Sequence, residues 1–248
     1  MLIYLEKKPF IIGKFDQVIY FLHKQITKHS PTQIILPCSL NDLSIDQVSD
    51  VYKGVDYFTS DSMFLTYFFR LKYHMRIERV YGPDLLKTFL ALEQKNSSSK
   101  KHYFLAADKQ VANKLSRLLT HKYPKLKTKV EFLPRDISAQ AEQQQLKNIL
   151  QTKPAIIWLG VGSPKQIELS NWLKQHSHGI KIFCVGAAFD FITGQKKQAP
   201  LWMQQSGLEW LFRLITEPKR LWKRYLVTIP KFLVLIIIKK IFKKSKQI

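Results

Sequence analysis

The chain has 248 residues, of which 46% are hydrophobic, and its 40 Lys and Arg against 18 Asp and Glu give a formal net charge of +22. This apolar content excludes an intrinsically disordered chain. The only two cysteines, Cys38 and Cys184, exclude a disulfide framework and a cysteine-rich zinc site, and they fit a reducing compartment. The charge predicts a polyanionic partner: nucleic acid, an anionic membrane surface or a phosphorylated substrate.

Neither a secretory signal nor a membrane-spanning helix is expected. The opening stretch MLIYLEKKPFIIGKFDQ lacks a basic leader, an apolar segment and a small-residue cleavage site in that order. No run reaches ~18 uninterrupted apolar residues, the length that a spanning helix needs.

Apolar runs that alternate with amphipathic segments predict an α/β fold. The predicted strands are 33–37, 55–59, 102–106, 127–132, 155–159 and 180–185, with a short extended piece at 78–81. The predicted helices are 41–52, 64–72, 85–94 with Asp84 as its N-cap, 110–122, 139–152 and 166–175. Short links between them predict a mostly parallel sheet with helices on both faces. Ligands of such sheets bind beyond the carboxyl ends of the strands.

The last part of the chain differs in character. Residues 202–225 are predicted to form one helix rich in Trp and Arg, and Ile229-Pro230 interrupts the helical pattern. Residues 218–248 carry ten Lys or Arg and no acid, around the apolar run FLVLIII at 232–238. That run cannot cross ~30 Å of hydrocarbon, but it can lie in a membrane interface while its lysines reach phosphate headgroups. The alternative is a C-terminal helix packed on the core with solvated lysines.

Two ionisable residues follow predicted strands in the first half. Asp61, in the loop TSDSM, can act as a general base that accepts a proton from an attacking hydroxyl, or it can simply cap the next helix. Arg79 can bind a phosphate through a bidentate fork, or it can pair at the surface with Glu78 or Asp84.

Two loops rich in small residues follow predicted strands in the second half. GVGSPKQ (160–166) opens a helix, and GAAFD (186–190) ends in a carboxylate. Their glycines allow a ligand to approach backbone N–H groups, which favour an anion. Neither loop has the Walker or the dinucleotide-binding pattern.

The sequence contains no motif typical of metal-dependent enzymes or of serine hydrolases. The sequence has no HExxH, no Asp-x-Asp pair and no GxSxG elbow. Without a metal, cationic side chains or a helix N-terminus must stabilise a leaving diphosphate. Arg213, Arg220 and Arg224 are spaced to share one face of the predicted helix and could do so.

Together these segments resemble the WecG/TagA/CpsF family, glycosyltransferase family 26, from about Val55 to Leu226. The blocks that carry the resemblance are WLGVGSPKQ (158–166), VGAAFDFITG (185–194) and GLEWLFRLITEPKRLWKRY (207–225), with TSDSM and ERVYGPDLL (78–86) in support. The resemblance implies a Rossmann-like α/β catalytic domain at residues 1–200. It also implies a helical, basic C-terminal appendage at 201–248 that completes the active site and docks on the membrane.

The resemblance also implies a reaction. Members of the family invert the anomeric centre, need no metal or other cofactor, and move a sugar from a UDP-sugar donor to a polyprenyl-diphosphate-linked acceptor. For this chain we expect N-acetylmannosamine or a related hexose, in bacterial surface polysaccharide or teichoic acid synthesis. The expected location is cytoplasmic, peripheral on the inner face of the plasma membrane.

The resemblance transfers roles to individual positions. Asp61 matches the proposed base. The candidates for binding acceptor and diphosphate are Arg79, Ser39, Asn41, Gln166, Arg213, Arg220 and Arg224. The candidates for binding UDP are Gly160, Gly162, Ser163, Pro164, Gly186, Ala187, Phe189 and Asp190. PCSLND (37–42) stands in place of the family's Thr-x-Asn element, and Ser62, Ile167 and Gln198 stand where Gly, Glu and Arg are usual.

Two other functions remain as alternatives. A catalytically silent, membrane-associated scaffold with the same fold would account for Ser62, Ile167 and Gln198. A nonspecific nucleic-acid-binding protein would account for the charge, but the sequence has no zinc finger, RNA-recognition signature or clear helix-turn-helix. We therefore expect no specific nucleic-acid partner.

Overall fold

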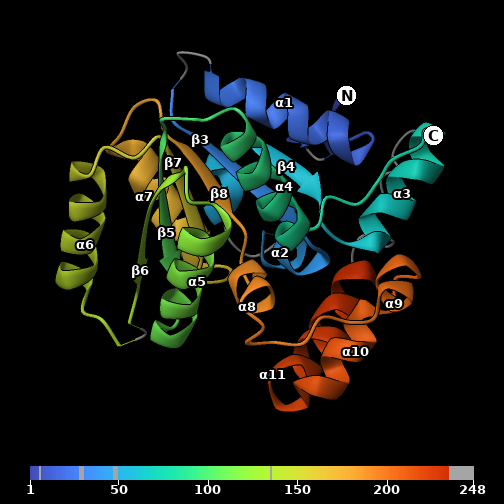
Figure 1. Cartoon of the computed structure of the whole chain (residues 1–248). Helices are drawn as coiled ribbons and strands as arrows, with labels where there is room; N and C mark the ends of the chain where they lie inside the picture. Colours follow the sequence, from blue (N-terminus) through green and yellow to red (C-terminus); the bar gives the residue numbers. More distant parts are fainter. Residues whose placement is uncertain (6, 28–30, 47–49, 135, 235–248) are drawn as a thin grey trace.

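The computed structural model describes residues 1–5, 7–27, 31–46, 50–134 and 136–234 (Figure 1). Its strands form one sheet in the order β1-β2-β4-β3-β8-β7-β5-β6. They are β1 (Leu2–Leu5), β2 (Lys8–Ile11), β3 (Gln33–Cys38), β4 (Tyr57–Ser60), β5 (Lys101–Ala106), β6 (Lys127–Phe132), β7 (Ile156–Gly160) and β8 (Lys181–Cys184). Every neighbouring pair is parallel except β1 with β2, so the predicted mostly parallel sheet is confirmed.

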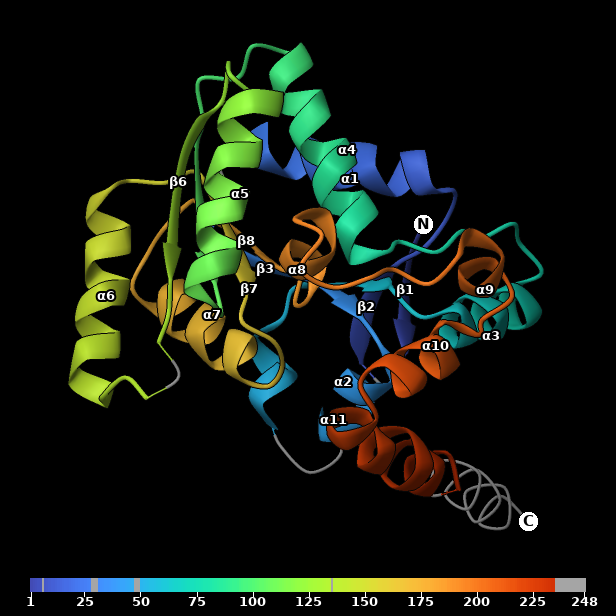
Figure 2. The ribbon, with the colours of Figure 1, turned by 60° about the horizontal axis from the view of Figure 1, so that its bottom comes forward.

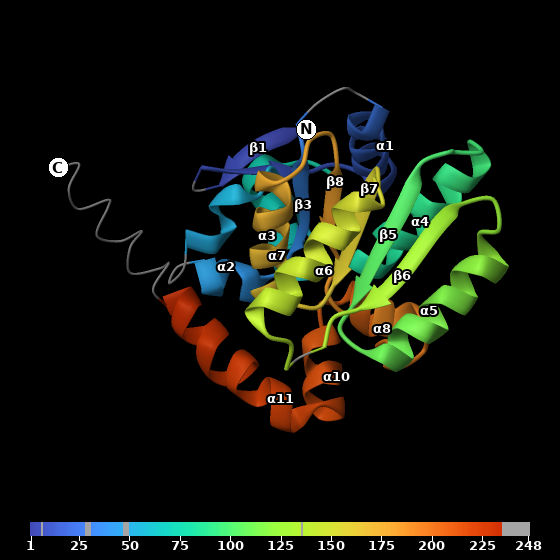
Figure 3. The same cartoon turned by 90° about the vertical axis from the view of Figure 1, so that its left-hand side faces the viewer.

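Helices cover both faces of the sheet (Figure 3). One face carries α1 (Phe15–Thr27), α4 (Gly82–Lys95), α5 (Lys109–Lys122) and α8 (Ala188–Ile192). The other carries α2 (Leu40–Asp46), a 3₁₀ helix (Asp50–Gly54), α3 (Met63–Tyr73), α6 (Ala139–Gln151) and α7 (Lys165–Gln175). Along β5, Tyr103 and Leu105 enter one core while Phe104 and Ala106 enter the other. Strands buried on both faces explain the near-continuous apolar runs.

Three local predictions for the first half are wrong or incomplete. The predicted elements begin only at residue 33, yet β1, β2 and α1 lie before it. Strands of four residues, one of which includes Pro9, leave little periodicity, whereas α1 has a periodic apolar signal at Val18, Ile19 and Leu22 that the prediction missed. The predicted helix 41–52 is instead α2 followed by the 3₁₀ turn. Asp84 does not cap α4: that helix begins at Gly82 with Tyr81 as its N-cap, since Pro83 favours the first helical turn.

The C-terminal region is a series of short helices. It comprises α9 (Leu201–Gln205), α10 (Glu209–Thr216), α11 (Pro218–Lys223), a π-helical turn (Arg224–Thr228) and helical residues 229–234. The predicted single helix 202–225 is therefore wrong. Gly207, with φ +80°, separates α9 from α10, and Pro218 begins a new helix because it cannot continue the preceding one. The predicted break at Ile229-Pro230 is also wrong, since helical geometry continues through both residues.

Of the predicted interfacial run 232–238, residues 232–234 are described; they are helical, with Phe232 buried and Val234 exposed. The rest of that run and the lysine-rich end of the tail, from residue 235 onward, lie outside the described residues. Among the described residues, none of the helices combines the length and the hydropathy that a membrane span requires. The division into a catalytic domain and an appendage at residue 200 stays a prediction.

The carboxyl ends of the central strands β3, β4, β7 and β8 lie at one edge of the sheet. Cys38 of β3 pairs with Ser60 of β4, and Leu159 of β7 pairs with Cys184 of β8. After β3 the chain passes to α2 on one face of the sheet, whereas after β8 it passes to α8 on the other. Such a divergence opens a crevice for ligands. The π-helical turn packs against α2, so the C-terminal helices lie beside this edge (Figures 1 and 2).

Gly160 ends β7 where the fully buried Phe189 ring of α8 leaves no room for a side chain. A Cβ at position 160 would overlap that ring. We expect Gly160→Ala to lower the free energy of unfolding by about 1–3 kcal/mol, because an overpacked core must shift. Urea unfolding measures this. In a double-mutant cycle, Phe189→Leu should relieve part of the cost, and strict additivity of the two changes would contradict the proposed overlap.

Candidate active site

Asp61 lies directly after β4 at the open edge of the sheet. Its backbone N–H donates to the Cys38 carbonyl at 3.0 Å, and its Oδ1 accepts a hydrogen bond from the Gly82 N–H at 3.0 Å. The alternative role as a helix cap is wrong, because the Ser62 Oγ caps α3 by accepting from the Leu65 N–H. The Asp61 carboxylate is thus held by the backbone at the entrance to α4 and is not used to begin α3.

The surroundings of Asp61 make it a better proton acceptor. Burial raises the pKa of its carboxyl to about 6; the Arg79 guanidinium opposes this shift, and the Glu209 carboxylate adds to it. A carboxyl group with this pKa is mostly ionised at neutral pH, yet it holds a proton more strongly than an ordinary aspartate. These are the properties required of a general base that works near pH 7.

Arg79 connects this carboxylate to the C-terminal helices. Its Nε donates to the Asp61 backbone carbonyl, and its Nη2 lies 2.7 Å from Glu209 Oε2. Its guanidinium stacks over the Tyr81 ring at 4.0 Å from the ring centre, and the Tyr81 hydroxyl donates to Glu209 Oε1 at 3.1 Å. The alternative partners, Glu78 and Asp84, are wrong: the ion pair is formed with Glu209.

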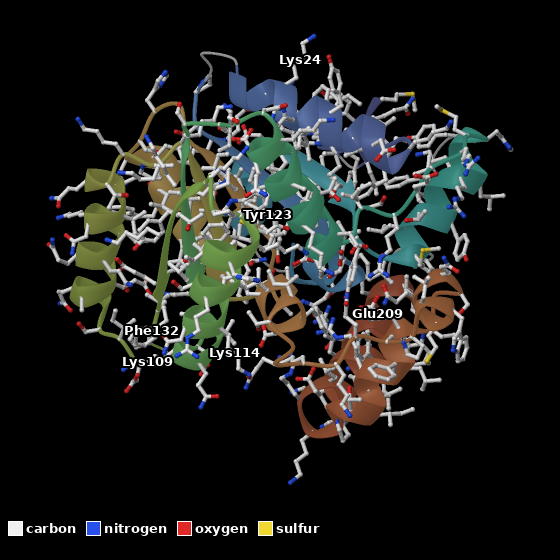
Figure 4. All side chains as sticks on the ribbon, in the orientation of Figure 1. Lys24, Lys109, Lys114, Tyr123, Phe132 and Glu209 are labelled. Atoms are coloured by element: carbon white, nitrogen blue, oxygen red, sulfur yellow. The ribbon has the colours of Figure 1, made fainter. Side chains whose placement is uncertain are left out.

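Glu209 is the first residue of α10, and it is buried against the α/β part of the molecule (Figure 4). Glu209 and Tyr81 are 128 positions apart in the chain. The described ion pair and hydrogen bond therefore bring the C-terminal helices to the loop that holds Asp61. Buried pairs of this kind are costly to break, because one charge is left without its partner.

A second polar cluster joins the ends of β3, β7 and β8. Asp42 of α2 accepts hydrogen bonds from the Ser39 Oγ at 2.6 Å, the Tyr52 hydroxyl at 3.2 Å and the Ser163 Oγ at 2.6 Å. The Gln166 Nε2 donates to Ser163 Oγ at 3.1 Å, and its Oε1 accepts from the Gly186 N–H at 3.0 Å. This cluster, Ser39–Asp42–Ser163–Gln166–Gly186, fixes the two glycine loops relative to each other.

The predicted UDP-binding residues fall into two groups: some lie on the surface of the glycine loops, and others are buried or already paired. Gly162 and Gly186 have φ of +84° and +55°, values that favour glycine and allow close approach to the backbone. Pro164 and Ala187 lie at the N-caps of α7 and α8. Phe189 is fully buried beneath Gly160, so it supports the loop from below, and Asp190 pairs with Lys196 at 3.7 Å.

Two further residues lie close to the site: Asn41, a predicted substrate-binding residue beside Asp42, and Gln198, which stands where the family usually has Arg. Asn41 is half-buried in the first turn of α2, where its carbonyl accepts from the Ser44 Oγ. Gln198 forms a side-chain hydrogen bond with Tyr81. Ile167, in contrast, is fully buried in the core, so it does not line the open edge.

The three arginines do not share one helical face, because Pro218 divides the segment that carries them. Arg220 is exposed and donates to Glu217 at 2.7 Å. Arg213 and Arg224 are half-buried, and the buried Nε of each has no hydrogen-bond partner among the described residues. Burial lowers the pKa of Arg224, and the nearby positive charge of Arg213 lowers it further. Tyr225 and Asp42 act in the opposite direction and raise this pKa, but they do not cancel the effect of burial. Arg224, on which Asp42 acts, thus keeps a buried donor available near the Asp42 cluster, and Arg213, whose guanidinium lies over the Phe191 ring, keeps one near Glu209 and Tyr81.

Comparison with known proteins agrees with this geometry. The model of the glycosyl transferase WecG/TagA/CpsF family matches residues 9–246. The chain belongs to this family. A Bacillus subtilis (strain 168) protein named N-acetylglucosaminyldiphosphoundecaprenol N-acetyl-beta-D-mannosaminyltransferase is 28% identical over 184 residues, which cover 74% of this chain and 69% of that protein.

The mostly parallel sheet with helices on both faces confirms the predicted fold class, and membership in the WecG/TagA/CpsF family confirms the assignment as a glycosyltransferase. The roles of individual site residues stay predictions. Within the described residues, His, Cys, Asp and Glu side chains form no group of three or more that could hold a metal ion.

Sequence reasoning did not select Asp42, Tyr52, Tyr81 or Glu209. Asp42 had a usable signal, because it follows a strand end as Asp61 does. Glu209 had none, since its partners lie more than 100 residues away in sequence.

The charges around Asp61 predict opposite effects of two substitutions on its pKa. Glu209→Gln removes a negative charge and should lower the pKa of Asp61, whereas Arg79→Gln removes a positive charge and should raise it. Carboxyl ¹³C NMR titration of the unmodified protein should find a midpoint at about 6. A midpoint unchanged in both variants, with folding intact by circular dichroism, would contradict this electrostatic account.

Proposed function

We propose that this glycosyltransferase moves a sugar from a UDP-sugar to a polyprenyl-diphosphate-linked sugar, with inversion and without a metal ion. The observation that carries the proposal is the placement of Asp61, whose raised pKa and backbone anchoring suit a general base at the edge where the glycine loops end. The name of the Bacillus relative supports an N-acetylglucosaminyl-diphosphoundecaprenol acceptor and an N-acetylmannosaminyl donor group.

The donor is proposed to lie across the loops 160–166 and 186–190. Backbone N–H groups beside Gly162 and Gly186 would face the diphosphate. The Gln166 amide holds the Gly186 loop in place, so it positions this surface. Ser39, which belongs to the Asp42 cluster, and Asn41, which precedes Asp42 in α2, are proposed to contact the sugars.

The chemical step is a single displacement. Asp61 accepts the proton of the acceptor hydroxyl, whose oxygen attacks the anomeric carbon from the face opposite the diphosphate. The bond from the anomeric carbon to the phosphate oxygen breaks, and UDP leaves with the electron pair. One displacement at that carbon inverts its configuration.

Arg213 and Arg224 are proposed to stabilise the charge that grows on the leaving diphosphate. Their buried Nε groups lack partners in the described structure, and an anion would supply them. Arg79 has a different role, since its guanidinium is already engaged with Glu209 and the Asp61 loop. It lowers the pKa of Asp61 and therefore keeps the base ionised at neutral pH.

The proposed location is the cytoplasmic face of the bacterial plasma membrane, where a polyprenyl-linked acceptor is embedded. Ten Lys or Arg between 218 and 248 would attract anionic headgroups, each worth ~1 kcal/mol near the surface. Holding the enzyme where its acceptor lies raises the local acceptor concentration and limits its orientations. The proposed pathway is surface polysaccharide or teichoic acid synthesis.

Replacement of the base tests the mechanism directly. Asp61→Asn should lower kcat by roughly 10²–10⁴, because proton transfer in the transition state is lost. UDP release with a lipid-linked acceptor measures this. Asp16→Asn, which alters an exposed carboxylate on α1, should retain activity within about twofold, a typical neutral surface change. Equal activity of folded Asp61→Asn and unmodified enzyme would remove Asp61 from the mechanism.

The pH dependence should follow the same carboxyl. Since the ionised form of Asp61 accepts the proton, kcat/KM should rise with pH up to a pKa of about 6 and level off above it. Glu209→Gln should move this acidic limb to lower pH, because the pKa of Asp61 falls. A rate profile that is flat through this region would show that another group accepts the proton.

The arginines should differ in their effects. Arg224→Gln should lower kcat/KM by about 10–100-fold, the loss expected for a charge-assisted contact of 1.5–3 kcal/mol. Arg220→Gln changes an exposed pair and should cost no more than about 1 kcal/mol, or roughly fivefold. Initial-rate UDP release at varied donor concentration compares them, and equal losses would contradict a special role for the buried arginine.

A further inference from the structure

The helix that follows Asp61 exposes a continuous apolar stripe. Successive residues of an α-helix are rotated by about 100°, so Tyr67, Leu71, Phe64 and Phe68 fall within an arc of about 100° on α3. All four are exposed, and Leu71 reaches 76%. The opposite side of α3, with Leu65 and Phe69, is buried in the core. The stripe is therefore additional to the core face of the helix.

Helix α9 extends the stripe into a wider surface. The Tyr67 hydroxyl donates to the Gln205 carbonyl at 3.0 Å, so α9 lies against α3, as Figures 1 and 2 both show. Leu201 and Trp202 of α9 are exposed, Trp202 at 62%. We call this the α3–α9 surface, and its members are Phe64, Tyr67, Phe68, Leu71, Leu201 and Trp202. Exposed aromatic and aliphatic side chains gathered on two adjoining helices mark an interaction site.

The charged residues on the two helices of the α3–α9 surface are all basic, which indicates an anionic partner. Arg70 and Lys72 flank the stripe on α3; the Arg70 guanidinium lies over the Tyr67 ring and the Lys72 ammonium over the Phe68 ring. The sequence has no acidic residue between 62 and 76 or between 199 and 208. Aromatic and aliphatic side chains bordered by cations are typical of helices that lie in the interface of an anionic lipid layer.

We propose that the α3–α9 surface inserts into the headgroup region of an anionic membrane and holds the catalytic edge against it. The proposal rests on the lipid-linked acceptor of the proposed function. Ser62, the N-cap of α3, directly follows Asp61, so the inserted helix begins at the base. An acceptor sugar whose lipid is embedded beside α3 would then reach Asp61. This contact is independent of the basic C-terminal tail.

Vesicle flotation of the full chain tests the surface. The probes are anionic vesicles of phosphatidylglycerol and phosphatidylcholine, and vesicles of phosphatidylcholine alone, which carry no net charge, serve as the control. The triple variant Phe64→Ser, Phe68→Ser, Leu71→Ser should bind anionic vesicles at least about tenfold more weakly than the unmodified chain, since three apolar anchors are lost. Tyr20→Ser, which alters an equally exposed aromatic residue on α1 (67%), should bind like the unmodified chain. Matched thermal unfolding curves would establish that each variant is folded.

Two UDP-release assays separate this inference from the proposed function. With a long-chain acceptor in vesicles, the triple variant should lose activity in proportion to binding, whereas with a water-soluble short-chain acceptor it should equal the unmodified enzyme. Unchanged vesicle binding by the folded triple variant would overturn the inference. So would a change only in oligomeric state, because the surface would then pair two copies of the chain. No UDP release by the unmodified enzyme with either acceptor would overturn the proposed function, while flotation would still test the surface.

Discussion

The buried ion pair between Arg79 and Glu209 connects the parts of the site that lie far apart in the chain. Arg79 holds the Asp61 loop through its backbone carbonyl, and Glu209 brings the start of α10 to the same place. Both charges also act on the pKa of Asp61, in opposite directions. One contact therefore sets the position of the C-terminal helices and the basicity of the proposed catalytic carboxylate. The pair is costly to break within a buried site, which favours a single arrangement of these elements.

The sheet explains why separate loops form one site. Parallel strands place all their carboxyl ends at the same edge, so residues after β3, β4, β7 and β8 meet without being close in sequence. Asp42 then connects Ser39 to Ser163, and Gln166 connects Ser163 to the Gly186 loop. These hydrogen bonds fix the loops of the proposed donor surface relative to one another, and α3 begins directly after Asp61.

The same topology explains which parts of the site could be predicted. Asp61, Gly162 and Gly186 each follow a buried apolar run, and periodicity locates such strand ends well. Glu209 and Tyr81 depend on a contact across most of the chain, for which local sequence has no signal. Helical spacing predicts one arginine face, but α10 ends at Thr216 and Pro218 begins a new helix between Arg213 and Arg224. The short strands β1 and β2 were missed because four residues are too few to establish a period.

The central claim is that Asp61 accepts the proton of the acceptor hydroxyl while UDP occupies the glycine loops. A crystal structure of the enzyme with UDP and a short-chain analogue of the lipid-linked acceptor tests it most directly. The account predicts an acceptor hydroxyl within hydrogen-bond distance, about 2.6–3.2 Å, of an Asp61 carboxylate oxygen, with the diphosphate beside Gly162, Gly186 and Arg224. An acceptor bound with its free hydroxyls away from Asp61, or a diphosphate bound elsewhere, would contradict it.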